Sequence, residues 1–329
     1  MKKFVWVFAL AVLAAMTVRA QQAQPTAGQA FQPGPREWAF PVIAGALAPE
    51  EDAPVRVPGS SKTYTPKQID DLNNPPDWFP EQHPTPPALV VKGRGGVLAC
   101  GSCHLMNGLG HPESADLAGL PAEYIFQQMQ DFKSGVRKDA ARMNGIAKEM
   151  SDQEMHEVAA YFSGMKSSRT TKVMEAAMVP RTFVGGGRMR FIDPKAAGQN
   201  EPIGKRIVTL PDDLDRVRHR DPNGDVFIAY APPGSLARGK ALVESGGNGK
   251  TVACAICHGE GLRGLGNVPK IAGVHPIYIA RQLFLFKDGT RSGVDGQLMK
   301  RPVAQLTDDD VLAISAYVAS LAPAQAGTN

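Results

Sequence analysis

The stretch that decides the fold occurs twice. It reads Cys100-Gly101-Ser102-Cys103-His104 in the first half of the chain and Cys254-Ala255-Ile256-Cys257-His258 in the second half. Each copy is a C-x-x-C-H motif, the attachment pattern for a c-type haem. Two thiols separated by two residues lie on one side of a helical turn, so both can form thioethers to one porphyrin. The adjacent His can then coordinate the iron. We therefore expect two covalently attached haem c groups, each with its iron.

Other uses of these cysteines explain the motif less well. A four-Cys zinc site needs both pairs close in space and gives no reason for the His after each pair. A thioredoxin-like redox pair needs a βαβ pattern, which is not visible here. Two disulfides do not account for a His at the same place twice. The predicted haem-binding residues are Cys100, Cys103, His104, Cys254, Cys257 and His258, and these four cysteines are the only ones in the protein.

The similarity between the two halves extends well beyond the motif. Matched residues lie at a constant offset of 154 up to Arg137, and at an offset of 156 beyond it. Because each copy has its own helices and its own prosthetic group, we interpret the repeat as two domains. The matched pairs include Tyr124 with Tyr278, Gln128 with Gln282, Phe132 with Phe286, Arg137 with Arg291, Met143 with Met299, Asp152 with Asp308 and Tyr161 with Tyr317.

The order of these motifs resembles the class I cytochromes c, most closely the tandem di-haem kind. It runs CxxCH, then L-A-G or I-A-G, then Y-x-x-x-Q-x-x-x-F-K-x-G-x-R, a Met, an acidic helix start and A-Y. The resemblance implies an all-α fold with cytochrome c domains at 88–166 and 234–322, roughly half of the chain. In that family a His and a Met hold the iron. The implied ligands are therefore His104 and Met143 in the first domain, and His258 and Met299 in the second.

The choice of Met143 depends on the repeat. The chain has 12 methionines, and most are expected to fill core space. Only Met143 has a Met partner, Met299, that also falls between the two C-terminal helices. Met129 matches Leu283 and Met150 matches Leu306, which favours ordinary packing. The competing methionines of the first half are Met129, Met150, Met155 and Met165.

Histidine is the alternative second ligand of the first iron. His111 or His156 could supply it, but neither has a His counterpart in the second half, which favours a surface role for both. His275 matches Pro121, so we do not expect it to bind iron. The resembled family often has a Pro whose carbonyl holds the proximal His. Pro269 fits that position, whereas the first copy has Ala115, whose carbonyl can still serve. Such unequal surroundings predict unequal reduction potentials.

Two further matched pairs have open interpretations. Arg137 and Arg291 could contact haem propionates, because guanidinium and carboxylate pair well, or they could be exposed loop arginines. Tyr124 and Tyr278 could line the haem edge or simply pack in the core.

Residues 1–20 have the features of a secretory signal peptide. They combine a basic start at Lys2, an apolar run from Phe4 to Val18, and the small residue Ala20 before a Gln-rich stretch. The apolar run is short for a membrane span, which needs about 20 residues, and no later segment is long and apolar enough. Arg19 is unusual beside a cleavage point, so an uncleaved anchor is the alternative. We expect export to the periplasm.

The charge excludes one class of partner. The formal net charge is +4, and removal of residues 1–20 takes away Lys2, Lys3 and Arg19, leaving 33 basic and 32 acidic residues. This near balance argues against nucleic acid as a partner. Steering toward a redox partner must then come from a local charged patch.

An arm and an insert surround the two domains. The arm, residues 21–87, holds 14 of the 27 prolines and is expected to be mostly irregular, with a short capped helix from Thr65. Trp38 and Trp78 either pin the arm to a haem domain, which we prefer, or form a docking surface. The insert, residues 167–233, contains β-like runs at 182–184, 206–210 and 226–230, which predict a small sheet. A short tail, 323–329, ends the chain.

The helix signals are clearest in the two domains. We expect the opening helix of each domain to contain its CxxCH motif, and the closing helix to cross it. A helix should run from Leu120-Pro121 through Phe132. Capping-box patterns at Ser151 and Thr307 should begin the closing helices.

The function follows from the expected ligands. An iron that holds both a His and a Met has no open position for a substrate, and no acid–base pair or nucleophile is visible nearby. We therefore expect an electron carrier, or an electron-transfer subunit of a dehydrogenase, and not an enzyme. The donor would be a dehydrogenase, and the acceptor an oxidase or another cytochrome. The alternatives, a di-haem peroxidase, a sulfur-compound oxidase or a gas sensor, all require an open haem site.

Overall fold

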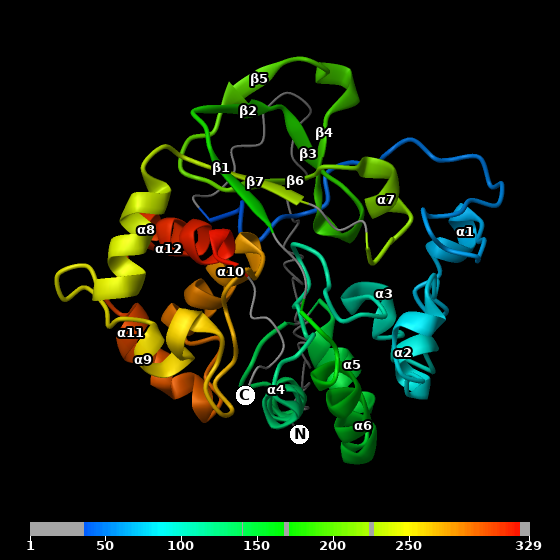
Figure 1. Cartoon of the computed structure of the whole chain (residues 1–329), viewed down its shortest axis with the longest axis horizontal. Coiled ribbons are helices and arrows are strands. Elements are labelled where there is room, and N and C mark those ends of the chain that lie inside the picture. The colour runs from blue at the N-terminus through cyan, green and yellow to red at the C-terminus, as the bar shows by residue number, and fades with distance from the viewer. Residues whose placement is uncertain (1–35, 140, 168–170, 224–226, 323–329) are drawn as a thin grey trace, which may run out of the picture. The chain divides into compact units, whose positions relative to one another are not determined.

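The computed structural model describes residues 36–139, 141–167, 171–223 and 227–322 (Figure 1). All of them belong to one unit, Gly34–Asn329. The predicted signal peptide (1–20), the first part of the arm (21–35), the tail (323–329) and Val226 of a predicted strand lie outside the described residues. Within the described part of the chain, no helix combines the length and apolar character that crossing a bilayer requires.

The first repeat is a set of short helices around one apolar core. The helix from Pro121 is confirmed and packs against the two helices that follow it. The closing helix begins at the predicted capping box, in which Ser151 Oγ accepts the Glu154 N–H and the Glu154 carboxylate accepts the Ser151 N–H. The helices are α2 (Ala88–Val91), α3 (Gly101–His104), α4 (Ala122–Ser134), α5 (Met143–Glu149) and α6 (Asp152–Ser163).

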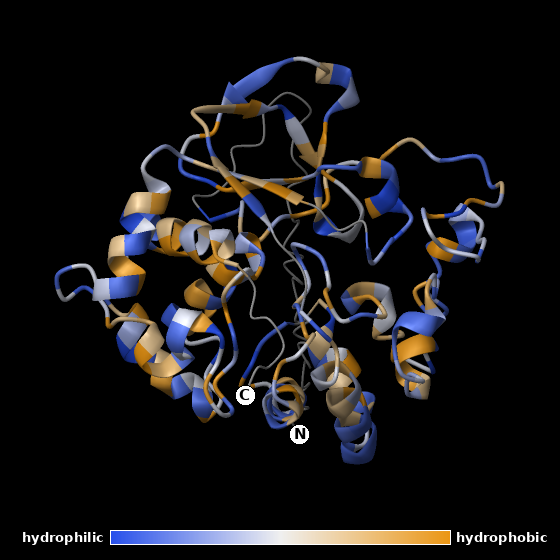
Figure 2. Cartoon of the chain, viewed as in Figure 1, coloured by the Kyte–Doolittle hydropathy of each residue, from blue (hydrophilic) through white to orange (hydrophobic). Residues whose placement is uncertain are grey.

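The second repeat has the same order with a longer opening helix. Its elements are α8 (Ser235–Ser245), α9 (Ala255–His258), η4 (Glu260–Leu262), α10 (Pro276–Lys287), η5 (Asp295–Met299), α11 (Lys300–Val303) and α12 (Asp308–Ser320). α12 packs against α8 and α10, and it is among the more apolar helices in Figure 2. The crossing with α8 is close at Gly239, because a Cβ there would overlap the carbonyl oxygen of Ala313.

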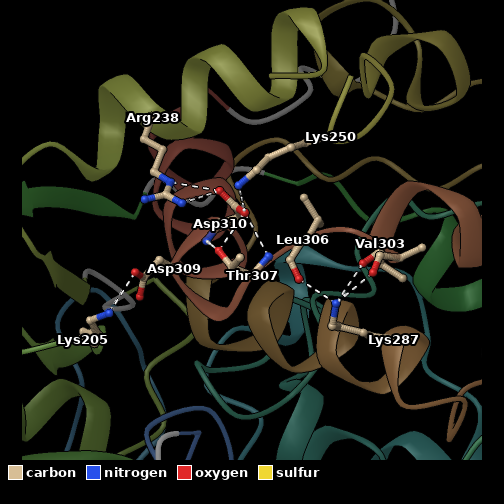
Figure 3. Close-up of polar contacts among 10 residues, drawn as sticks. Lys205, Arg238, Lys250, Lys287, Val303, Leu306, Thr307, Asp309 and Asp310 are labelled. Carbon is tan, nitrogen blue, oxygen red and sulfur yellow. Dashed lines mark hydrogen bonds and ion pairs between the residues drawn. The ribbon is translucent and has the colours of Figure 1, made fainter. Parts of the chain in front are cut away.

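The predicted capping box of α12 contains a buried carboxylate, that of Asp310. Asp310 Oδ2 accepts the Thr307 N–H at 2.9 Å, and its carboxylate pairs with Arg238 at 2.6 Å and Lys250 at 2.7 Å (Figure 3). Burial alone raises the pKa of Asp310, but these hydrogen bonds outweigh it and hold the pKa well below its usual value. The box therefore ties the start of α12 to α8.

The helices that hold the motifs differ from the prediction. The expectation that each opening helix contains the CxxCH motif is wrong, because the motif forms a one-turn helix of its own, α3 or α9. Each of these helices ends at a residue with positive φ, Leu105 at 62° and Gly259 at 76°, which stops the helix. The closing helices α6 and α12 pack on α2 and α8, the helices that precede the motifs.

The insert contains more strands than the sequence predicted. The expected runs form β3 (Thr182–Val184), β6 (Val208–Pro211) and β7 (Phe227–Ala231), and four strands were missed: β1 (Lys172–Glu175), β2 (Met178–Pro180), β4 (Arg190–Ile192) and β5 (Asn200–Pro202). Instead of one small sheet, the described residues of the insert form three, with strand orders β1-β7-β6, β2-β5 and β3-β4. The remaining elements are η2 (Gly186–Arg188), η3 (Pro194–Ala196) and α7 (Leu214–Arg218). The chain is thus mostly helical, with small sheets between the repeats.

The arm is held down by its two tryptophans. It is largely irregular, as expected, with the predicted capped helix α1 (Pro66–Ile69) and a short η1 (Pro80–Gln82). Trp38 lies edge-on to Phe284 in the core of the second repeat, which confirms that it pins the arm there. Trp78 is buried in a separate small core, and its Nε1–H donates to the His219 carbonyl of the insert at 2.8 Å. It therefore fastens the arm to the insert, and the expectation that it pins the arm to a haem domain is wrong for Trp78.

Candidate haem sites

The two motif histidines are held in the same way. His104 Nδ1–H donates to the Ala115 carbonyl at 2.9 Å, and His258 Nδ1–H donates to the Pro269 carbonyl at 2.8 Å. These bonds confirm that a backbone carbonyl serves in both copies. A carbonyl can only accept, so it fixes the Nδ1–H tautomer and leaves Nε2 available as a ligand.

Burial also favours the ligating form of both rings. It lowers the pKa of His104 and of His258, and the hydrogen bonds to Ala115 and Pro269 oppose this only in part. A neutral imidazole is the form that binds a metal ion. Burial raises the pKa of Cys100 to about 12 and that of Cys254 to about 11. The thiols are thus not poised as thiolates, the form that a zinc site or a redox-active pair uses.

A cavity of about 1530 Å³ opens beside the first motif. Cys100, Cys103 and His104 line it on one side, and apolar side chains such as Ile125 and Phe162 line it elsewhere. A large, mostly apolar cavity with two thiols and an imidazole at its wall fits a covalently attached porphyrin. The residues present therefore suit haem c.

The two predicted methionine ligands occupy matched places. Met143 is the first residue of α5, is half-buried and lines the cavity. Met299 is the last residue of η5 and packs, with Cys254, against the core of the second repeat. Among the competing methionines, Met155 and Met165 are buried in the first core, whereas Met129 and Met150 also line the cavity. The assignment of Met143 still rests on its repeat partner.

The other histidines have contacts of their own. His156 is exposed and stacks on Phe126 at 3.8 Å between ring centroids, in agreement with the expected surface role. His111 lines the cavity, with its Nε2 2.9 Å from Ser114 Oγ. His275 is buried against Phe227. Within the described ranges, no group of three or more His, Cys, Asp or Glu is arranged to hold a metal ion.

Arg137 and Arg291 meet where the two repeats contact each other. Their side chains are only 6% and 8% exposed, so the interpretation as exposed loop arginines is wrong. Their backbones pair as an antiparallel bridge. Arg137 donates to the Tyr278 hydroxyl at 3.0 Å, and Arg291 donates to the Tyr124 hydroxyl at 2.8 Å. Each therefore reaches the tyrosine of the other repeat.

Two glutamines complete this contact. Gln128 Oε1 accepts from both arginines at 2.7 Å, and Gln282 Oε1 accepts from Arg291 at 2.9 Å and from Arg137 at 3.1 Å. We call the six residues the arginine cluster: Tyr124, Gln128, Arg137, Tyr278, Gln282 and Arg291. Five of them line the cavity, both tyrosines included. The sequence identified these residues as matched pairs, but it gave no sign that the pairs would meet.

Two further ion pairs between the repeats were missed altogether. Lys270 Nζ lies 3.1 Å from Asp116 Oδ2, with each side chain 4% exposed. Arg281 pairs with Glu113 and donates to the Glu113 carbonyl at 3.0 Å. Both pairs join an acid of the first repeat to a base of the second. The sequence did contain a signal for the first pair. Positions 116 and 270 match at the offset of 154 and carry opposite charges.

The comparisons with known proteins agree with the geometry. The Cytochrome c family model matches residues 90–166 and 236–322. The chain belongs to the cytochrome c family. It is 27% identical over 243 residues to cytochrome c4 of Stutzerimonas stutzeri, covering 70% of this chain and 87% of that protein. It is 27% identical over 228 residues to the thiosulfate dehydrogenase electron acceptor of Thiomonas intermedia, covering 68% of this chain and 79% of that protein.

A solved structure is also similar. The crystal structure of reduced recombinant cytochrome c4 from Pseudomonas stutzeri shares 26% identity, covers 68% of this chain and 93% of that chain, and gives a TM-score of 0.44. From the sequence comparisons, this cytochrome is a tandem, c4-like protein whose two domains carry two covalent haem c groups. It is an electron carrier, and the alternative of a di-haem enzyme is set aside.

Proposed function

We propose that this cytochrome is a periplasmic carrier that takes single electrons from a dehydrogenase and passes them to an oxidase or another cytochrome. The observation that carries the proposal is the matched His–carbonyl bond in both motifs, 2.9 Å and 2.8 Å long. It indicates two centres prepared in the same way for permanent ligation. Export is supported by the signal-like residues 1–20.

Each domain supplies a complete set of haem-binding residues. In the domain proposed at 88–166, Cys100 and Cys103 form the thioethers, and His104 and Met143 hold the iron. In the domain proposed at 234–322, Cys254 and Cys257 form the thioethers, and His258 and Met299 hold the iron. The arm (21–87), the insert (167–233) and the tail (323–329) lie outside both domains.

The chain's own residues keep each centre closed and fixed. When bound, haem c supplies one-electron chemistry between Fe(III) and Fe(II). The Ala115 and Pro269 carbonyls hold the imidazoles at one orientation, so little has to reorganise when the charge changes. Apolar side chains such as Ile125 and Phe162 line the first site and give the porphyrin an apolar surface to pack against. The arginine cluster links the two domains through buried hydrogen bonds.

A thiosulfate dehydrogenase is the donor that the relatives favour. Two of them are electron acceptors of that enzyme, from Thiomonas intermedia and Stutzerimonas stutzeri, at 27% and 28% identity. Purified thiosulfate dehydrogenase with thiosulfate should reduce this cytochrome rapidly in stopped-flow absorbance, and thiosulfate alone should not. If the enzyme reduced a mitochondrial-type cytochrome c quickly but left this protein oxidised, another dehydrogenase would be the donor.

Ligation can be tested on the exported protein. Its mass should exceed that of the polypeptide by two haem groups, and the weak red-edge band of Met–Fe(III) should have the strength of two Met ligands per chain. Spectroelectrochemical titration should resolve two one-electron steps. Rapid carbon monoxide binding to the reduced protein would show an open iron and would contradict the proposed ligands.

A further inference from the structure

Segments from outside the repeats form part of the wall around the first haem site. Besides Cys100 and Cys103, the cavity is lined by side chains from 40–52 and 66–72 of the arm and from 186–191 and 217–221 of the insert. The Cytochrome c family model matches only residues 90–166 and 236–322, so all four segments lie outside it. We call them, together with Pro222, the cover. The cover is thus an addition to the two repeated domains.

Hydrogen bonds hold the cover in place. The Asn107 side-chain amide of the first domain donates to the Pro222 carbonyl of the insert at 3.1 Å. Within the cover, the Arg218 guanidinium donates to the Ala48 carbonyl of the arm at 2.8 Å and pairs with Glu50 at 3.4 Å. The arm and the insert are therefore bound to each other as well as to the first domain.

Matched positions of the two domains show what the cover does. Cys103 is half-buried, whereas its match Cys257 is exposed. His111 is half-buried and lies against Gly187 of the insert, where an added Cβ would be 3.7 Å from the imidazole Cε1. Its match Leu265 is 61% exposed. The surface around the second motif is therefore open at positions where the first domain is overlaid.

We propose that the cover closes the cysteine-bearing edge of the first haem to partner proteins, so that this haem exchanges electrons with them only by way of the second haem. Electron transfer between proteins requires the partner to bring its redox centre close to a haem edge. An ordered segment lying across that edge keeps a folded partner away. The inference rests on the proposed carrier function and gives it one site of exchange, which donor and acceptor use in turn.

The test places one bulky group at matched positions of the two domains. Leu298 is 73% exposed, Arg142 is exposed, and each directly precedes a proposed methionine ligand. Because the four native cysteines form thioethers, Leu298→Cys and Arg142→Cys each give the whole holoprotein one thiol for a maleimide-linked polyethylene glycol. Reduced flavodoxin is the protein donor, and free reduced flavin is the small donor with the same chemistry.

The two labels should have unequal effects in stopped-flow absorbance. The label at position 298 should slow the reduction of both haems by flavodoxin about tenfold, because docking at a defined patch limits the rate. The label at position 142 should change that rate by less than about twofold, because the first domain is not the docking site. Leu265→Cys gives a second labelling site on the second domain and should behave as Leu298→Cys does.

Two controls separate blocked docking from other effects. Ile192→Cys on β4 carries the same label at a side chain that is 50% exposed in the parent, and it should leave the flavodoxin rate unchanged. Free reduced flavin should reduce both haems of every labelled protein at the parent rate. That control shows that the centres still accept electrons, so a failure of the carrier function is seen separately from a failure of this inference.

Amide hydrogen exchange gives a readout that does not depend on electron transfer. Oxidised flavodoxin in excess should slow exchange in a peptide spanning 253–259 of the second motif and leave 99–105 of the first motif unchanged. Equal slowing of flavodoxin reduction by the labels at 298 and 142 would overturn the inference. So would an unchanged rate after labelling at 298, or flavodoxin protection of the first motif.

Discussion

The two copies of the motif share their internal geometry but differ in what lies over them. Ser102 of the first motif is buried, and its carbonyl accepts from Arg220 of the insert at 2.8 Å. The arm also contacts this region, since the Ala99 N–H donates to the Leu72 carbonyl at 3.1 Å. The matched residue of the second motif, Ile256, is 69% exposed. The first motif is covered and the second is open.

This difference separates the role of the repeat from that of the segments outside it. The repeat encodes the pocket, because both histidines find a carbonyl at the same distance along the chain, 11 residues away. The covering comes from segments outside the repeat. The two domains can therefore have the same histidine geometry and still differ in how far each motif is exposed to solvent.

The largest expected effect comes from removing one haem. A domain of about 80 residues is only marginally stable by its own apolar burial, so each haem should supply much of its core. Cys100→Ala with Cys103→Ala should unfold the first domain, and Cys254→Ala with Cys257→Ala the second, each losing half of the haem absorbance. Far-ultraviolet circular dichroism measures the lost helix. Because the arm and insert cover the first motif, the first double variant should lose less helix than the second. Equal losses would contradict the difference between a covered and an open motif. Native helicity in either variant would refute the role of haem in folding.

Much of this organisation could be predicted from local signals. The motifs, the helix from Pro121, the capping boxes at Ser151 and Thr307 and the capped helix at Thr65 all depend on neighbouring residues. These signals are reliable because each depends on residues only a few positions apart in the sequence.

What could not be predicted depends on contacts between distant residues. The four missed strands are three or four residues long and gain their partners only in three dimensions. The burial of Arg137 and Arg291 follows from the docking of two domains, which no single stretch encodes. The same holds for Glu113 with Arg281, whose positions do not match in the repeat. The helix that holds the first motif ends at Leu105, which has a positive φ. Leucine rarely adopts that conformation, so nothing in the sequence indicated this break.

The next largest effect should come from the methionine ligands. Met143→His and Met299→His replace a thioether by an imidazole and should each lower one midpoint potential strongly and halve the red-edge band. Spectroelectrochemistry with band assignment measures both. Met129→Leu, which copies the residue at the matched position 283, is the control and should change neither. A Met129→Leu protein that lost half the band would move the first ligand to Met129.

The capping carboxylates give a smaller, domain-specific effect. Glu154 and Asp310 are matched residues, but Asp310 is 1% exposed with two basic partners, whereas Glu154 pairs with Arg94 at the surface. Asp310→Asn should therefore cost about 2 kcal/mol, since it removes the charge from a buried carboxylate that accepts hydrogen bonds from Arg238 and Lys250. Glu154→Gln should cost about 1 kcal/mol or less. Urea unfolding compares them, and equal costs would contradict the difference in burial.

The lowered pKa of Asp310 also makes the stability of the fold depend on pH. The pKa of Asp310 is lowered in the folded chain, so its stabilisation is complete above its unfolded value of about 4 and is lost as the pH falls through the lowered value. Unfolding midpoints measured between pH 7 and pH 2 should fall less steeply in Asp310→Asn than in the parent. Parallel curves would show that another carboxylate governs acid stability.

The smallest effect should come from opening the cover of the first motif. Arg220→Ala removes the hydrogen bond to the Ser102 carbonyl, a loss of about 1 kcal/mol, and leaves the thioether and iron ligands in place. Amide hydrogen exchange should then accelerate in a peptide spanning 99–105, whose N–H groups close the one-turn helix α3. The matched peptide, 253–259, already lies at an open surface and has no contact with Arg220 to lose, so its exchange should stay as in the parent. Faster amide exchange in both peptides would mean that the cover stabilises the whole chain. The two motifs would then differ in solvent exposure but not in local stability.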